Sequence, residues 1–383
     1  MAADPIDRES AFDVSELFFS TTNRKGIIES GNDVFVRVSK HPEAELIGSP
    51  HNIIRHPDMP RAAFRLLWDH LLRGDPIAAY VKNMAADGSY YWVMACVLPC
   101  GDGFLSVRLK PTSELLTAAV IPVYTEVRAL ERRMEQAGTP RREVAERSAG
   151  RLLEMLAEAG FPDYGSFMRM ALPVEIRARS AAIAASPAGQ ALPSRGIAAD
   201  LRLAGARLDD VFHGLEGYAA ANASLGTSTA FIHDLAGDVR LNATNGLIAA
   251  SKLTQGGATL GAVANEMSRC ASGMATAVDR FADVARPAMG LLHDLEFRIS
   301  MAKAQVDMAT YFADELAGTG HSHGHEMMAT RRRSLDVLLG SLRREVDELL
   351  EALRGLDEHF TELGERTDGI GSTLSTLGAL HMA

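Results

Sequence analysis

The first 110 residues contain several short, mostly apolar runs of the kind that form β-strands, and turn residues separate them. Phe18–Asn23 and Gly26–Ser30 predict two strands around a tight turn. Ile77–Met84, Tyr90–Leu98 and Phe104–Lys110 predict three more, which are separated by turns rich in Asp and Gly. We therefore expect five strands in this part of the chain.

Between the two groups of strands, Arg61–Arg73 predicts an amphipathic helix, with Pro60 before it and Gly74 after it. Its expected buried face carries Phe64, Leu67, Trp68 and Leu71. Two strands, then helices, then three strands predict an α+β domain: a small antiparallel sheet of five strands, covered on one face by helices.

Beyond residue 112 the pattern is helical and predicts an all-α, coiled-coil region with breaks at Ser186–Arg195 and Gly318–His325. One apolar seam alternates steps of three and four residues: Leu208, Val211, Leu215, Tyr218, Asn222, Leu225, Thr229, Ile232, Ala236 and Val239. Leu335–Leu363 is a second amphipathic run. Such seams leave apolar stripes on a monomer, so we expect a homodimer built from antiparallel helical hairpins.

Composition supports a boundary near residue 112, because 11 of the 23 aromatic residues, including both tryptophans, lie before it. The expected segments are a tail (1–17), the α+β domain (18–112), a helical connector (113–185), a linker (186–200), a helical hairpin (201–285) and C-terminal helices (286–383).

The net charge of −10 over 383 residues argues against a nucleic-acid-binding protein, which needs a basic surface. No apolar run approaches the roughly 20 residues that span a bilayer. The polar N-terminus and the odd number of cysteines, 3, predict a reduced, cytoplasmic protein.

Four stretches of the α+β domain resemble the PAS domain of bacterial aerotaxis receptors: FFSTTNRKGIIESGNDVFVRVS, PHNIIRHPDMPRAAFRLLW, VKNMAADGSYYWVMACVLP and SVRLKP. The resemblance implies a PAS domain that binds FAD without a covalent bond and reports redox state, and hence oxygen, to a chemotaxis kinase. The flavin-linked residues of that family fall here on Asn32, Arg55, His56, Asp58, Trp68 and Asn83.

The chemistry of these side chains suits FAD. Trp68 offers an aromatic surface for stacking, and Arg55 and His56 offer donors to phosphate. Asp58 would orient Arg55 or His56, while the two asparagines can both donate to and accept from the polar edge of the flavin. Simpler interpretations remain, in which Trp68 is a core residue and Arg55 pairs with Asp58 in a loop. A PAS domain without a cofactor, or one that binds haem through His56, also remains open.

Asn245–Ala271 resembles the hairpin tip of chemoreceptor signalling domains. The matching residues are Asn245, Ile248, Ala250, Gly257, Val263, Ala264, Glu266 and Ala271. Ala249 and Leu260 depart from the pattern, where that family has Glu and Phe. The resemblance implies a shortened, divergent relative whose partner is a chemotaxis kinase or adaptor complex.

Other clusters carry weaker signals. His321, His323 and His325 suggest either a metal-binding loop or a solvated turn, and Cys96 and Cys100 either a redox pair or small core residues. His233-Asp234-Leu235 resembles a kinase phosphoacceptor site, but no ATP-binding pattern follows. We expect no enzyme and no metal site, and predict a cytoplasmic redox or oxygen sensor; the alternatives are a cofactor-free interaction module and a phosphoacceptor protein.

Overall fold

The computed structural model describes residues 3–186, 196–319 and 325–380. The chain divides into two compact units. The first comprises Met1–Asp210 and Glu296–Leu349, and the second Val211–Leu295 and Leu350–Ala383. The predicted triple-histidine motif lies at the edge of the second gap, where no side chain is described.

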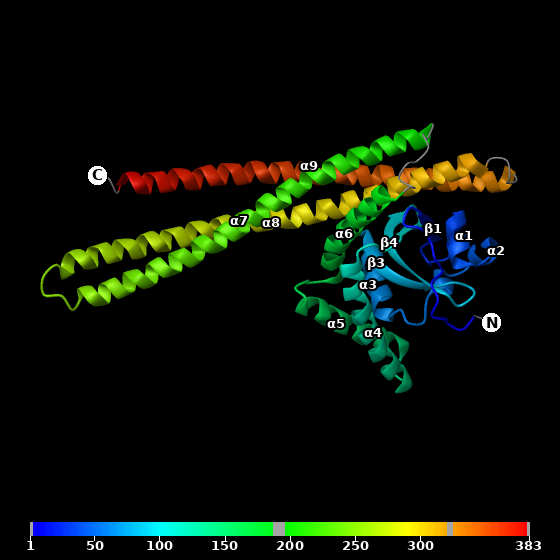
Figure 1. The fold of residues 1–383 in the computed structure, drawn as a ribbon, viewed down its shortest axis with the longest axis horizontal. Coiled ribbons are helices and arrows are strands. Elements are labelled where there is room, and N and C mark those ends of the chain that lie inside the picture. The colour runs from blue at the N-terminus through cyan, green and yellow to red at the C-terminus, as the bar shows by residue number, and fades with distance from the viewer. Residues whose placement is uncertain (1–2, 187–195, 320–324, 381–383) are drawn as a thin grey trace. The chain divides into compact units, whose positions relative to one another are not determined.

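The first unit is built on a five-stranded antiparallel sheet, as the sequence pattern predicts (Figure 1). Its strands are β1 (Phe18–Asn23), β2 (Ile28–Gly31), β3 (Ile77–Met84), β4 (Tyr90–Cys100) and β5 (Gly103–Leu109). Their order across the sheet is β2-β1-β5-β4-β3. Because β1 pairs with β5, the two groups of strands are joined into one sheet.

Helices cover the inner face of this sheet. They are α1 (Asp33–Ser39), α2 (Glu43–Leu46), the 3-10 helix η1 (His51–Ile54) and α3 (Arg61–Leu71). The predicted helix over residues 61–73 is confirmed, although it ends two residues earlier. Inward-facing Phe18 stacks on Phe35 of α1 with ring centroids 6.0 Å apart. The core of the domain therefore lies between the sheet and these helices.

The region after the sheet is helical, but it is interrupted more often than the sequence pattern predicts. It consists of α4 (Glu114–Gln136), α5 (Arg141–Glu158), α6 (Tyr164–Ala185), α7 (Ile197–Ala250), α8 (Gly257–Thr319) and α9 (His325–Leu380). The unpredicted breaks follow α4 and α5, whereas the break after α7 falls within the expected helical hairpin over 201–285. Gly138, Gly160 and Gly256 adopt positive φ angles there, a backbone conformation that ends helices.

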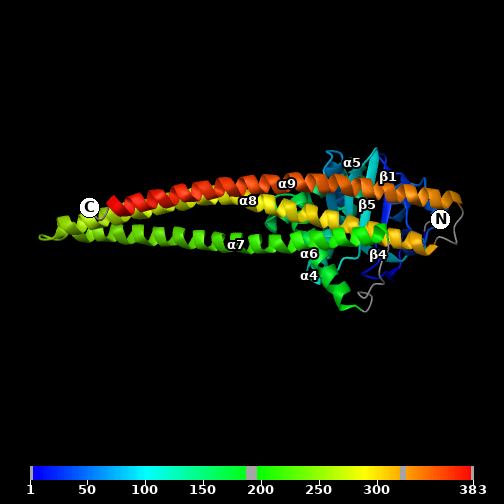
Figure 2. The ribbon, with the colours of Figure 1, turned by 90° about the horizontal axis from the view of Figure 1, so that it is seen from above.

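The outer face of the sheet is covered by α6 and by the part of α8 that belongs to the first unit. Phe19, which points away from α1, meets Phe312 of α8 edge to face at 5.0 Å. α9 packs beside α8, and Arg298 and Glu348 pair across them at 2.7 Å (Figure 2). The sheet is thus buried on both faces.

In the second unit, α7 and α8 form an antiparallel hairpin whose turn spans residues 251–256. Between residues 230 and 275 its buried positions are small: Ala236, Ala243, Ala250, Ala264 and Ala271. The expected seam is only partly correct, because Leu215 and Ala236 are buried while Val211 is exposed. The second helix of the hairpin also continues to Thr319, beyond the expected boundary at residue 285. In the described ranges, no helix combines the length and the apolar character needed to cross a membrane.

Candidate functional site

A cavity of about 340 Å³ lies between the inner face of the sheet and α3. The sheet contributes Ser20, Thr22, Val81, Asn83, Ala95, Val97, Phe104, Ser106 and Arg108. These residues recur at every second position of β1, β3, β4 and β5, because alternate side chains of a strand point to the same face. The opposite wall comes from α3 and from residues 25–26 and 50–55.

The α3 wall is largely apolar and aromatic. It consists of Phe64, Leu67, Trp68 and Leu71. Trp68 meets Phe104 of β5 edge to face, with ring centroids 5.2 Å apart. Gly26 adopts a φ of 73°, and a Cβ there would lie 3.4 Å from the indole. A flat aromatic ligand would find a suitable wall here.

The Pro50–Pro60 segment contributes to the cavity with its first half only. His51, Asn52 and Arg55 line it. Arg55 donates from Nη2 to the Met59 carbonyl at 2.8 Å, and its guanidinium lies 4.8 Å from the centre of the Phe64 ring. Burial lowers the pKa of Arg55 to about 10, so it remains a cation at neutral pH.

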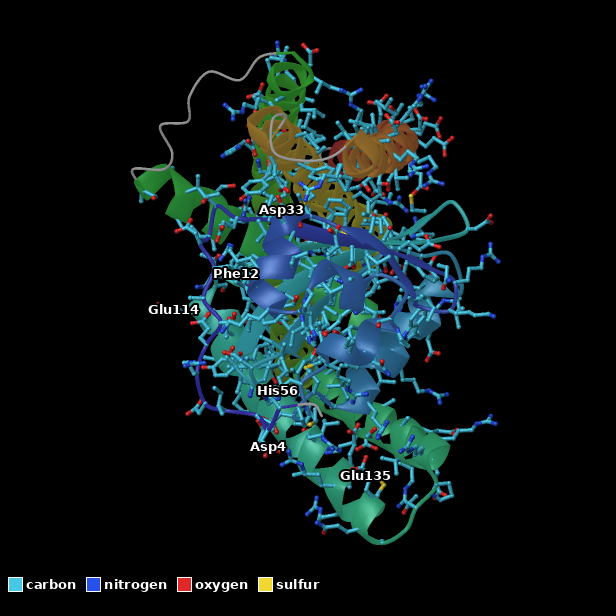
Figure 3. All side chains as sticks on the ribbon, turned by 90° about the vertical axis from the view of Figure 1, so that its right-hand side faces the viewer. Asp4, Phe12, Asp33, His56, Glu114 and Glu135 are labelled. Atoms are coloured by element: carbon cyan, nitrogen blue, oxygen red, sulfur yellow. The ribbon has the colours of Figure 1, made fainter. Side chains whose placement is uncertain are left out.

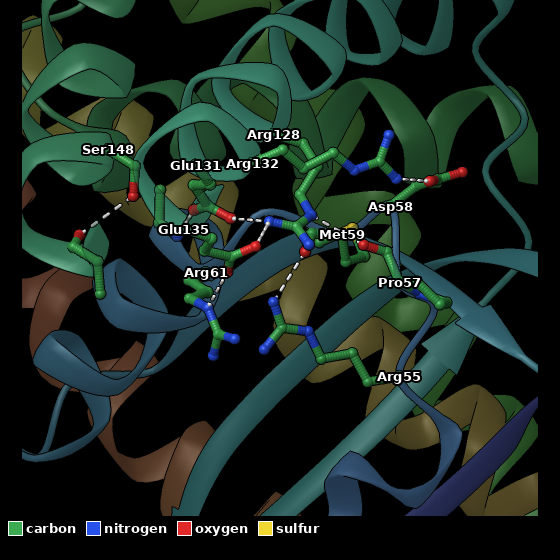
Figure 4. A network of polar contacts seen from close by, with 12 residues as sticks. Arg55, Pro57, Asp58, Met59, Arg61, Arg128, Glu131, Arg132, Glu135 and Ser148 are labelled. Carbon is green, nitrogen blue, oxygen red and sulfur yellow. Dashed lines mark hydrogen bonds and ion pairs between the residues drawn. The ribbon is translucent and has the colours of Figure 1, made fainter. Parts of the chain in front are cut away.

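The second half of the segment packs against α4 (Figure 4). Asp58 forms ion pairs with Lys82 at 3.0 Å and with Arg132 of α4 at 2.7 Å. Buried His56 accepts at Nδ1 from the backbone N–H of Asp58, 3.1 Å away. Burial, together with the neighbouring Lys82, lowers the pKa of His56 to about 4. His56 and Asp58 therefore lie outside the cavity lining, and Asp58 contacts His56 rather than Arg55.

Asn32 also lies outside the lining. Its Oδ1 accepts from the Phe19 backbone N–H at 3.3 Å, and its Nδ2 donates to the Leu17 carbonyl at 3.1 Å. The same Nδ2 donates to Glu315 of α8 at 3.3 Å. Of the six predicted site residues, the structure therefore brings Arg55, Trp68 and Asn83 together at the cavity.

Sequence reasoning missed several polar residues of the cavity, among them Arg108, Ser20 and His51. Arg108 of β5 is buried and donates to Ser20 Oγ at 2.9 Å, and it also contacts Nε2 of His51. A charged residue near the end of a strand is usually exposed, so Arg108 did not stand out. Its position could have identified it, because Arg108 follows Phe104 by four residues and Ser106 by two and therefore shares the inward-facing register of β5.

A polar cluster joins α8 and α9 to the start of α1. Glu315 accepts from the backbone N–H of Asp33 at 3.2 Å, and Arg331 of α9 pairs with both carboxylates. Figure 3 labels Asp33 on the side of the domain that carries α8 and α9. Burial and the adjacent Asp33 raise the pKa of Glu315 to about 7, although Arg331 and Asn32 act in the opposite direction.

Folding raises this pKa above its ordinary value of 4.5, so Glu315 makes its full contribution to the free energy of unfolding below about pH 4.5. Its contribution is lost as the pH rises towards about 7, so the first unit is expected to be more stable to urea near pH 5 than near pH 8. Glu315→Gln should reduce this difference, whereas Glu348→Gln, an exposed carboxylate on α9, should leave it unchanged. An identical pH profile for Glu315→Gln and the natural chain would contradict the assignment.

Comparison with known proteins agrees with this architecture. Residues 29–103 match the PAS fold. This match, with the five-stranded sheet and its helices, defines the sheet-bearing part of the chain as a PAS domain followed by a largely helical region.

The chain is similar to the aerotaxis receptor of Escherichia coli, with 43% identity over 115 residues. The matched region is 29% of this chain and 22% of that receptor, so the chain spans about a fifth of its length. The chemoreceptor-like tip at Asn245–Ala271 lies outside the PAS match and stays a prediction.

Solved structures with related folds include a light-oxygen-voltage domain described with a flavin analogue, at 18% identity and a TM-score of 0.25. The match covers 29% of this chain and 87% of the chain of that domain. The LOV domain of a blue-light activated histidine kinase from Erythrobacter litoralis is 12% identical, with a TM-score of 0.22, over 24% of this chain and 90% of that one.

Proposed function

We propose that this chain is a cytoplasmic redox or oxygen sensor in signal transduction or chemotaxis, whose PAS domain binds FAD and relays its state to the helical region. The observation that carries the proposal is a cavity with apolar walls and buried donors that have no protein partner. Asn83 Nδ2 and Arg108 Nη1 are such donors, and both residues line the cavity. Tyr91 Oη, on the inward-facing register of β4, is a third.

These groups fit a flavin. Its ring system has apolar faces and one edge with carbonyl oxygens, which would accept from Asn83 and Arg108. Trp68 and Phe64 supply the aromatic wall, and two cations, Lys25 and Arg55, lie where they can meet the pyrophosphate. A buried donor without a partner costs about 1–3 kcal/mol, which a ligand acceptor would recover.

A bound flavin would supply reversible electron uptake, which changes charge and hydrogen bonding at its polar edge. The chain can pass such a change through β3. Asn83 faces the cavity, whereas Tyr80, three residues earlier, faces the opposite side and donates to Glu175 of α6 at 2.7 Å. Glu175 also accepts from the backbone N–H groups of Thr112 and Ser113, at 2.6 and 2.9 Å. The cavity is thereby connected to the first turn of α4.

The C-terminal half of α4 contacts α3, the helix that forms one wall of the cavity. Buried Glu131 accepts from the backbone N–H of Ala62 at 3.1 Å, in the first turn of α3 (Figure 4). Arg128 donates to the Pro57 carbonyl at 2.9 Å, and Glu135 pairs with Arg61 at 3.0 Å. A shift of α3 against a bound ligand therefore reaches α4 directly.

The haem alternative has less support from the geometry. His56, its candidate ligand, lies outside the cavity lining, and its Nδ1 already accepts a hydrogen bond. A PAS module without a cofactor, and a phosphoacceptor protein, remain the alternatives. For the phosphoacceptor, His233 is exposed on α7, and incubation with labelled ATP and a candidate kinase tests it.

The proposal is tested by the absorption spectrum of the purified chain. We expect the double band of oxidised flavin, either directly or after incubation with FAD. FAD released by heating and separated by chromatography would identify the cofactor. Uptake of haem with a sharp Soret band and no uptake of FAD would favour haem; uptake of neither at tenfold excess would leave a cofactor-free module.

The proposal includes assembly as a homodimer and coupling to a chemotaxis kinase or adaptor complex. Large apolar side chains of the hairpin are exposed, among them Phe231 at 66% and Leu241 at 62%, while its buried positions hold alanines. A second hairpin would cover them. Light scattering that shows only a 41.2 kDa species would argue against the dimer, and a pull-down from native extract tests the coupling.

A further inference from the structure

Arg108 is a buried cation that no carboxylate of the described chain neutralises. Only 2% of the residue is exposed. Within the described ranges, no carboxylate oxygen lies within 4.0 Å of its guanidinium nitrogens, the longest distance of a salt bridge. Its protein partners are neutral: Ser20 Oγ and His51 Nε2 accept its hydrogen bonds.

The remaining surroundings of Arg108 add no negative charge. The rings of Phe18 and Phe35 lie 5.8 and 5.4 Å from the guanidinium carbon. Such aromatic contacts stabilise a cation far less than burial of an unpaired charge destabilises it. Burial, followed by the repulsion from Arg108, lowers the pKa of His51 well below its ordinary value, so His51 is neutral and acts as an acceptor. Tyr91, the other titratable neighbour, has a pKa raised by burial and is also neutral.

Arg108 nevertheless stays charged, because burial lowers its pKa only to about 10. Among the residues that the structure describes, its Nη1 has no hydrogen-bond partner, and the residue lines the cavity. Arg55 at the cavity is only half-buried, and the carboxylates of Glu131 and Glu135 partly offset its charge. Lys25, the third cation of the lining, is exposed. Arg108 is thus the fully buried positive charge of the cavity that no carboxylate of the described ranges offsets.

We propose that Arg108 is the counter-charge for an anionic ligand edge, so that the cavity binds the reduced, anionic flavin more tightly than the neutral, oxidised flavin. This inference rests on the proposed function. Oxidised flavin that takes up two electrons from an external reductant and one proton at N5 becomes an anion, with its charge on the N1–C2 edge. Arg108 would form an ion-paired hydrogen bond with that edge, which is stronger than its hydrogen bond to the uncharged edge of the oxidised ring.

The test is the midpoint potential of the bound flavin, measured by anaerobic titration with dithionite. In the natural chain we expect a potential above that of free flavin at the same pH. Arg108→Met should lower the preference for the reduced form at least tenfold, which is about 30 mV for a two-electron couple. Arg108→Lys should retain most of the preference. Arg147→Met, at an exposed arginine of α5 outside the cavity lining, should match the natural chain.

A second measurement concerns the flavin-free protein. Arg108→Met removes the unpaired charge, so its thermal midpoint without flavin is expected to equal or exceed that of the natural chain. If Arg108→Met does not fold, the potential of the natural chain against free flavin still decides. A bound potential equal to or below the free value would overturn the inference and leave flavin binding intact, whereas failure of the natural chain to bind flavin would overturn both.

Discussion

Trp68→Ala is expected to lower the affinity of the chain for FAD by about 3–5 kcal/mol, a loss of more than a hundredfold, as for other truncations of large aromatic side chains in packed sites. The reason is geometric. Trp68 forms part of the α3 wall and contacts Phe104 across the cavity, so its loss opens the wall to water and removes the surface against which the ring would stack. Titration of the flavin-free protein with FAD, followed by flavin fluorescence, measures the change.

The chain has a matched control in its only other tryptophan. Trp92 of β4 stacks on Tyr124 of α4 with ring centroids 6.4 Å apart, and it does not line the cavity. Trp92→Ala should reduce stability but leave the FAD affinity within a few fold of the natural value. Equal losses of affinity in the two variants would show that the effect comes from destabilisation and not from the cavity wall.

Glu175→Ala is expected to destabilise the first unit by about 3–6 kcal/mol, because it leaves several buried donors without an acceptor. These donors are the Tyr80 hydroxyl and the backbone N–H groups of Thr112 and Ser113. Burial and the neighbouring Glu175 raise the pKa of Tyr80, which keeps its hydroxyl protonated and able to donate. Urea unfolding followed by circular dichroism gives the free energy.

Glu154→Ala is the control for this variant, because Glu154 is an exposed carboxylate of α5 whose pair with Arg151 lies at the surface. Its expected effect is below about 0.5 kcal/mol, in the usual range for surface substitutions. The double substitution of Glu175→Ala with Tyr80→Phe should recover part of the loss. Tyr80→Phe removes one of the donors that Glu175→Ala leaves without an acceptor. A Glu175→Ala protein as stable as Glu154→Ala would contradict the role of Glu175.

The strands of the PAS domain could be predicted because each is a short β-like run bounded by turn residues, and α3 because Pro60 and Gly74 frame a single amphipathic face. The breaks at Gly138 and Gly160 were missed, since a single glycine inside a long helical pattern does not by itself end a helix. The helix of the expected hairpin also runs further than the boundary at residue 285, because α8 continues as regular helix to Thr319.

The candidate site was predicted in part. Trp68, Arg55 and Asn83 were identified by motif and do line the cavity. The unpaired state of Arg108 depends on which acidic groups surround it in three dimensions, and strand periodicity carries no information about that. Likewise, the contact between Asn32 and Glu315 joins residues that are 283 positions apart, so no local pattern could indicate it.

The Pro50–Pro60 segment faces two ways, and this affects how far it can diverge in evolution. Arg55 faces the cavity, while Pro57 and Asp58 bind α4 through Arg128 and Arg132. A relative whose PAS domain binds no cofactor would still need the second half of the segment to hold α4. Selection for the packing of α4 would then be enough to preserve the sequence RHPDMP. In related sequences, this signature would therefore indicate the docking of α4 rather than flavin binding. Substitutions at Arg108 and Trp68 would be the better indication that a relative binds no flavin.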